Sequence, residues 1–91
     1  MRKSDDISYI YDIASKRIKL FRKYRKLTQE QLSAGSTFSR GFIANIELAK
    51  TSQTFSLGVL YYLSIKLNIP IELFVKKDIS KELKEMGIKE N

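Results

Sequence analysis

The sequence predicts an all-α domain built as a bundle of five or six helices. Strand-type alternation of apolar and polar residues is not sustained anywhere, and one Pro and four Gly interrupt the 91 residues. Apolar residues instead recur at helical spacing near the N-terminus, at Ile10, Ala14, Ile18 and Phe21. This length suits one small domain with a single core.

The first predicted helix spans about residues 5–26, and the start of the second is marked by three signals. The Thr28 hydroxyl is a good N-cap, and Gln31 completes a T-x-x-Q capping box. Leu27 and Leu32 occupy the hydrophobic staple positions on either side of this cap.

The third helix repeats this pattern, with Ser39 as its cap and with Phe38 and Ile43 at the staple positions. Ile43 and Ile46 form an i, i+3 apolar edge that we expect to face the core. Phe42 is intermediate, and the outward positions are then Arg40, Gly41, Ala44 and Asn45.

After a polar connector, a fourth helix is expected over about residues 56–67, with Leu60, Leu63 and Leu67 inward. Asn68 is a plausible stop for it, and a short fifth helix follows at 71–75. The tail from residue 76 is weakly amphipathic, so it is either a sixth helix ended by Gly87 or a frayed end.

The net charge of +7 is unevenly distributed along the chain. Residues 16–26 hold seven Lys or Arg and no acid, whereas residues 27–75 hold three cations and three acids. A basic patch of this kind attracts polyanions, first nucleic acid and second an anionic membrane surface. The alternative is an ordinary solvated helix face.

The second and third predicted helices are short, strongly capped and close together, and this arrangement suggests why the third keeps small and polar side chains on its outer side. An α-helix fits the DNA major groove, where each base pair shows its own pattern of donors and acceptors. A second helix, crossed over the first through a tight turn, braces it and contacts phosphate. The bracing helix needs only a cap and an apolar edge, while the reading helix must keep small and hydrogen-bonding side chains outward.

In this order and spacing, LTQEQL at 27–32, SRGFIANIE at 39–47, SLGVLYYLSIKLNI at 56–69 and IELF at 71–74 resemble the Cro/cI-type helix-turn-helix family, also called the Xre family. The resemblance covers about residues 17–75. It implies a lambda-repressor-like DNA-binding domain there, preceded at 1–16 by an extension and the start of the first helix, and followed at 76–91 by a tail. It also implies a positioning helix from Thr28, a recognition helix over about 39–47, and a structural ion pair between Arg22 and Glu47.

Candidate DNA contacts follow from these assignments. Gln29 could donate to phosphate, and Arg40 could read guanine or clamp a phosphate. Asn45 could pair with adenine, contact a phosphate, or have a cap-like or solvent-exposed role near the helix end. Phe42 could touch a thymine methyl group or pack on its own domain. The full predicted set is Gln29, Ser39, Arg40, Gly41, Phe42, Asn45, Lys50 and Thr51, all on or beside the two short helices.

We expect a sequence-specific transcriptional regulator, a repressor or autoregulator, that binds a near-palindromic duplex site as a homodimer. A phage-type repressor, a restriction–modification controller and an antitoxin are equal candidates. For the dimer interface the sequence favours the short apolar helix and the end of the fourth helix, with the tail as a further candidate. The short helix is too apolar to cap so small a core without a partner, and the interface residues expected are Ile69, Ile71, Leu73, Phe74 and Val75.

Other classes are less favoured. Without Cys or His a zinc site is close to excluded, and no phosphate loop or paired acids indicate an enzyme, so we expect no cofactor. No apolar run approaches a membrane span and no signal peptide is recognisable, which makes the cytoplasm the expected location. The main rival is a protein-interaction module of the same fold that has little DNA binding, and a lipid-surface role for the first helix comes third.

Overall fold

The computed structural model describes residues 7–48 and 54–89, and the regular secondary structure among them is helical, with no strand. The prediction of an all-α fold is therefore confirmed. The elements are α1 (Ile7–Tyr24), α2 (Gln29–Ser33), α3 (Arg40–Glu47), α4 (Leu57–Leu67), the 3-10 helix η2 (Ile71–Phe74) and α5 (Ser80–Met86).

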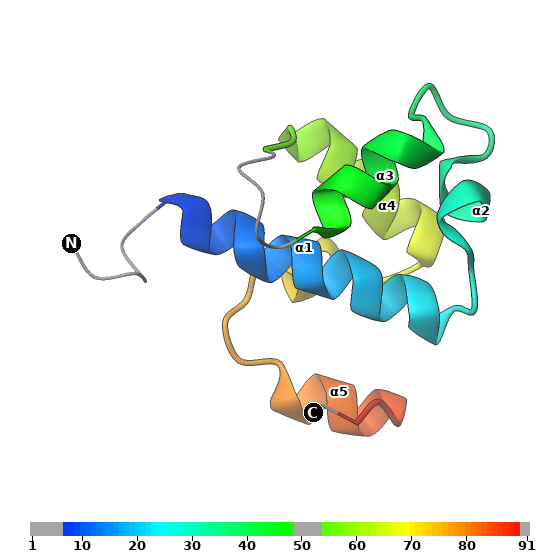
Figure 1. Cartoon of the computed structure of the whole chain (residues 1–91). Coiled ribbons are helices and arrows are strands. Elements are labelled where there is room, and N and C mark those ends of the chain that lie inside the picture. The colour runs from blue at the N-terminus through cyan, green and yellow to red at the C-terminus, as the bar shows by residue number, and fades with distance from the viewer. Residues whose placement is uncertain (1–6, 49–53, 90–91) are drawn as a thin grey trace.

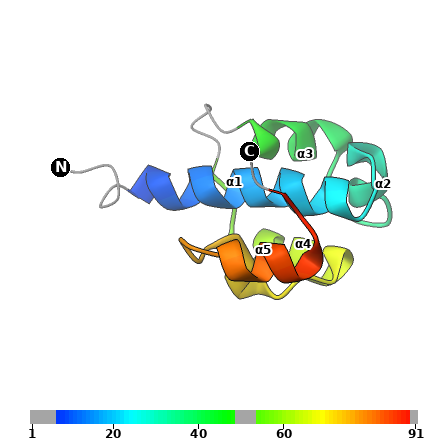
Figure 2. The same cartoon turned by 90° about the horizontal axis from the view of Figure 1, so that it is seen from below.

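The long helix α1 forms the centre of the arrangement. In Figure 1 it crosses the molecule with α2, α3 and α4 on one side and α5 on the other. In Figure 2, seen from below, α3 and α5 lie on opposite sides of α1. Every other helix is therefore arranged around this one rod.

One apolar cluster fills the space between the elements. From α1 it takes Ile18 and Phe21, and the Phe21 ring meets Phe74 of η2 edge to face, with ring centroids 5.2 Å apart. The predicted inward residues of α3 and α4 all join it. They are Ile43, Ile46, Leu60, Leu63 and Leu67.

The predicted stop of the fourth helix is confirmed at Asn68, which takes the left-handed conformation with φ +55°. An Asn side chain tolerates this conformation better than most residues do. Gly87 ends α5 in the same way, with φ +77°. Both helices therefore end at the residues that the sequence indicates as helix stops.

The tail is a helix that belongs to the core over residues 80–86. Ile79 and Leu83 are each only 2% exposed and pack into the same cluster as α1 and α4. At its start, Lys76 pairs with Glu82 at 2.9 Å, and this hydrogen bond lowers the pKa of Glu82. The alternative of a frayed end does not hold for these residues.

The packing of α5 on the core changes the interpretation of the residues that we expected at a dimer interface. Ile69, Leu73 and Phe74 are buried inside the chain's own core, and Ile71 and Val75 are half-buried. From the sequence alone, these side chains are too apolar to cap so small a core without a partner. The core accommodates them because α5 extends it, so the three buried ones are not accessible to a second copy in this structure.

Arg17 of α1 and Arg25, the residue that directly follows this helix, tie the C-terminal half of the chain to the central rod. The Arg17 guanidinium donates to the carbonyl oxygens of Leu73, Lys76 and Lys77 at 2.7–2.9 Å. Arg25 donates to those of Leu67 and Asn68 at 2.7 and 2.9 Å, where α4 leaves its last carbonyls without helical partners. Part of the basic run therefore stabilises the fold through hydrogen bonds and does not only add positive charge to the surface.

If α5 belongs to the core, Leu83→Ala should lower the free energy of unfolding by about 2–5 kcal/mol, because it opens a cavity at a buried site. The matched variant Lys84→Ala, at an exposed neighbouring position, should change it by less than about 0.5 kcal/mol. Urea denaturation followed by circular dichroism measures both. Equal, small effects would show that the tail is not packed as described.

Candidate functional site

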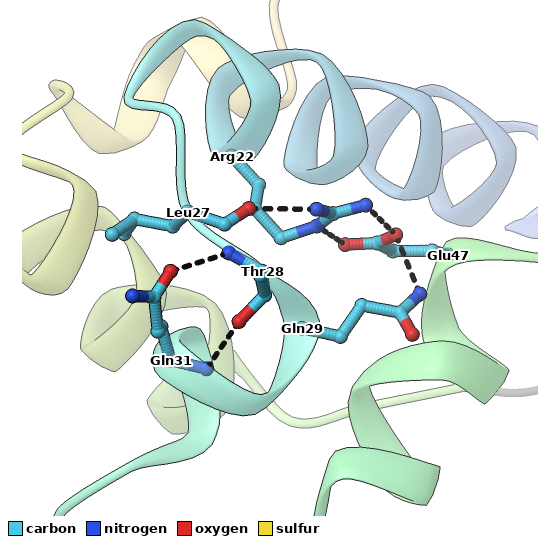
Figure 3. A network of polar contacts seen from close by, with 6 residues as sticks. All are labelled: Arg22, Leu27, Thr28, Gln29, Gln31 and Glu47. Carbon is cyan, nitrogen blue, oxygen red and sulfur yellow. Dashed lines mark hydrogen bonds and ion pairs between the residues drawn. The ribbon is translucent and has the colours of Figure 1, made fainter.

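The start of α2 carries the capping box that the sequence predicts. Thr28 Oγ1 accepts from the backbone N–H of Gln31 at 3.0 Å, and Gln31 Oε1 accepts from the backbone N–H of Thr28 at 2.8 Å (Figure 3). Such reciprocal bonds satisfy two donors that a helix start otherwise leaves without partners. This explains how a helix of only five residues is held in place.

The start of α3 is capped by Ser39, whose Oγ accepts from the backbone N–H of Phe42 at 3.0 Å. Ile43 and Ile46 are completely buried, so the predicted inner edge is confirmed. The opposite side is open, since three residues are exposed there: Arg40, Gly41 and Asn45. The helix therefore has one anchored edge and one accessible edge.

The connection between α2 and α3 is shaped by Gly35 and Ser36. Gly35 has φ +81°, a conformation that glycine adopts without steric cost. Ser36 Oγ donates to the carbonyl oxygen of Ser33 at 2.6 Å and accepts from the backbone N–H of Phe38 at 3.0 Å. The two helices thus pack against each other through a turn with its own internal hydrogen bonds.

A buried polar cluster joins α1, α2 and α3 at the far end of α3 (Figure 3). Arg22 Nε donates to Glu47 Oε2 at 2.7 Å and its terminal nitrogen donates to Oε1 at 3.0 Å, a bidentate pair. Gln29 Nε2 adds a bond of 3.1 Å to the same Oε1. The geometry implied for Arg22 and Glu47 by the family resemblance is therefore present.

The structure modifies the expectation for two predicted contact residues. Gln29 is half-buried and donates to Glu47, so its amide helps to hold α3. The Phe42 ring is also half-buried and lies 5.4 Å from the Phe38 ring, which in turn meets Tyr62 of α4 edge to face. Phe42 thus packs on its own domain, one of its two predicted roles. Lys50 and Thr51 lie outside the described residues.

A polar hollow lies where α1, α2 and α3 approach one another. Arg22, Thr28, Gln29, Glu30 and Arg40 line it. The hollow brings Arg40, a predicted DNA contact of α3, close to the start of α2. Since Glu30 also lines it, the two outward charges of the hollow, on Glu30 and Arg40, are of opposite sign.

The basic run at residues 16–25, in α1 and directly after it, divides into two functional groups. Its three arginines, at 17, 22 and 25, all bond to other parts of the chain. Lys16, Lys19 and Lys23 are exposed and follow the spacing i, i+3, i+7, which places them on one face of the helix. The exposed positive charge of α1 is therefore a lysine face, which consists of these three residues.

Several of these features were missed from sequence. No local sequence pattern indicates that Gln29 bonds to Glu47 or that Ser36 organises the turn. Each role depends on how two helices meet. The same is true of Lys66, whose Nζ donates to the Ala34 carbonyl oxygen at 3.0 Å. The run of arginines at 17, 22 and 25 was visible as charge, but not as a set of links between helices.

Comparison of the chain with protein-family models, with curated proteins and with solved structures finds no match. Over residues 7–48 and 54–89, no group of three or more acidic side chains is placed to hold a metal ion. None of the helices in those ranges has the length and apolar character needed to cross a bilayer.

Arg22→Met should lower the free energy of unfolding by about 3–5 kcal/mol, because Glu47 would be left buried without its cation. Replacing both residues, as Arg22→Met with Glu47→Leu, should recover most of that loss, since no buried charge then lacks a partner. Arg40→Met, at an exposed site, is the matched control and should cost less than about 0.5 kcal/mol. Urea denaturation would contradict this account if Arg22→Met behaved like the control.

Proposed function

We propose that the chain binds duplex DNA sequence-specifically and regulates transcription, with α3 as the helix that enters the major groove. The observation that carries the proposal is the exposed edge of α3. Arg40, Gly41 and Asn45 lie on it, while its opposite edge is fixed in the core. In this interpretation, α2 and α3 form a helix-turn-helix of the kind that the sequence resembles.

The chemistry of this edge supports base readout. The Arg guanidinium can donate twice to guanine O6 and N7, and an Asn amide can pair with adenine N6 and N7. Gly41 between them has no side chain, and a Cβ there would meet nothing closer than Ser39 Oγ at 3.7 Å, so it leaves room for close approach to a base or sugar. No large apolar residue stands exposed on this edge between Arg40 and Asn45.

Positioning is the second support. Specific hydrogen bonds to bases require a helix whose angle does not vary, because each bidentate contact has a narrow geometry. The Ser39 cap and the Phe38 ring fix the start of α3, and the bidentate contact of Arg22 with Glu47 fixes its end. The reading edge is thereby held in one orientation before any DNA arrives.

The lysine face supplies the electrostatic part of the proposal. Arg40 alone gives α3 little attraction for phosphates, since Glu30 lies in the same hollow. Lys19 is one helical turn from Arg22, which lines that hollow, and in this proposal the lysine face contacts the phosphates beside the site that α3 reads. Phosphate contacts of this kind add affinity without reading sequence.

A second candidate function is a protein-interaction module. The observation in its favour is the outward side of α4, where Leu57, Tyr61 and Ile65 are all exposed. An apolar surface of this kind commonly marks a site of protein association. It is compatible with DNA binding, so the two functions are separated by whether the α3 variants below lose a DNA activity.

Arg40→Ala and Asn45→Ala should each reduce binding to a selected site by about 5- to 150-fold, the equivalent of about 1–3 kcal/mol for a bidentate base contact. The site is obtained by repeated selection of random duplexes with the wild-type protein, and affinity is measured by gel retardation. Lys81→Ala removes an exposed cation in α5 and should leave binding nearly unchanged.

Base readout by α3 would be overturned if the selection enriched no sequence. It would also be overturned if both α3 variants bound the enriched duplexes as tightly as the wild type does. Absence of any DNA retention at low salt would favour the protein-interaction module instead.

The lysine face has a separate test. Replacing Lys16, Lys19 and Lys23 together by Gln should flatten the dependence of log K on log salt by about 0.9 for each phosphate that the variant no longer neutralises. The same replacement of three exposed cations in the tail, Lys81, Lys84 and Lys89, removes equal charge and serves as the control. Fluorescence anisotropy across a salt series gives both slopes. Equal changes in the two variants would mean that total charge matters and the lysine face does not.

A further inference from the structure

We infer that the outward side of α4 is a self-association surface, through which two copies of this chain pair by their α4 helices. Leu57, Tyr61 and Ile65 are 75%, 59% and 63% exposed. They follow the spacing i, i+4, i+8 and so form one apolar stripe, while Leu60, Leu63 and Leu67 on the opposite side fill the core. The apolar stripe consists of those three exposed residues.

The stripe is uncharged, and this decides what can cover it. The only charged residue of α4 is Lys66, and its Nζ is bonded to the Ala34 carbonyl oxygen at the end of α2. With a net charge of +7, two copies repel each other over most of their surface. A face without charge is where this repulsion opposes close approach least, whereas an acidic partner protein would be attracted to the lysine-rich surfaces.

A hollow of about 160 Å³ continues the stripe towards α1. Leu57 belongs to both surfaces, and the other walls include Ile10, Tyr11, Phe55 and Val75. An apolar cavity of roughly 150 Å³ is large enough for a benzene-sized group. The hollow can therefore receive one apolar side chain from a second copy.

The stripe also matches itself. Tyr61 is at its midpoint, one helical turn from Leu57 on one side and from Ile65 on the other. If two α4 helices pack antiparallel about a two-fold axis at Tyr61, each Leu57 faces Ile65 of the second copy. That Ile65 then lies at the mouth of the hollow beside Leu57. A surface of this form is complementary to its own copy without any further residue.

The small size of the proposed interface limits the affinity expected for the dimer. An eleven-residue helix is about 16 Å long, so the stripe and the rim of the hollow cover less than the roughly 800 Å² per partner of a standard interface. We expect a reversible dimer with Kd in the micromolar range, on the order of 10–100 μM.

Sedimentation velocity of the wild-type chain at rising concentration tests the inference directly. A monomer–dimer equilibrium should appear, and raising the salt from about 50 mM to about 500 mM should tighten it, because salt screens the repulsion between like-charged copies. Contact with an acidic partner would weaken over the same range. A chain that stays monomeric at about 1 mM, ten times the upper Kd expected here, overturns the inference.

Tyr61→Glu should raise the Kd by about 30-fold or more, because it places two like charges beside the axis and removes the central side chain. Leu48→Glu makes a similar change at another exposed apolar residue, at the end of α3, and should leave the Kd nearly unchanged. Circular dichroism confirms that each variant folds. A dimer that withstands Tyr61→Glu places the contact elsewhere and overturns the inference.

The antiparallel pairing has a sharper test. A variant with Glu at both 57 and 65, and a second with Lys at both, should each be monomeric because like charges face each other. Mixed together, they should form a heterodimer with two opposite-charge pairs. No pairing in the mixture would contradict this arrangement of α4. These measurements use no DNA, so their failure leaves the α3 experiments unaffected.

Discussion

The carboxylate of Glu47 imposes the strictest condition on this structure. A buried carboxylate is strongly unfavourable unless a cation and hydrogen-bond donors surround it. Here Arg22 comes from α1 and Gln29 from α2, while Glu47 itself ends α3. Satisfying one residue thus requires three helices to meet at one point, and this sets the angle at which the outward edge of α3 faces solvent.

The opposite half of the molecule is organised by apolar packing and by carbonyl contacts. Phe74 packs on Phe21, and α5 adds Ile79 and Leu83 to the cluster. Arg17 bonds to three successive parts of the segment after α4. These contacts bury the residues around η2, and the three most exposed of the large apolar side chains in the described residues, Leu57, Tyr61 and Ile65, lie on α4.

Local features of the sequence were sufficient to predict where α2 and α3 begin and which edge of α3 faces the core. Thr28, Gln31 and Ser39 act through bonds within three residues, so their roles as caps could be read directly from the spacing. The inner edge of α3 followed from periodicity in the same way. These signals need no knowledge of the neighbouring helices.

Features that depend on packing between helices were not predictable from the residues alone. Whether the apolar segment around Leu73 faced the core or a second copy depended on where α5 would lie, and the tail alone left that open. The position of Gln29 at the start of a helix suggests a phosphate contact. Its bond to Glu47 could not be predicted, because the two residues come together only when α2 and α3 pack. Leu57, Tyr61 and Ile65 were visible in the sequence, but their exposure followed only from the orientation of α4.

The division of the basic run at residues 16–25 between arginine and lysine has an evolutionary consequence. Arg17, Arg22 and Arg25 each use a planar fork to reach two or more oxygen atoms, a task that the single ammonium of Lys performs poorly. Lys16, Lys19 and Lys23 contribute charge at an exposed face, where either basic residue serves. In homologous chains, substitution between the two amino acids should therefore be tolerated at the lysine positions and selected against at the arginine positions, although all six carry the same charge.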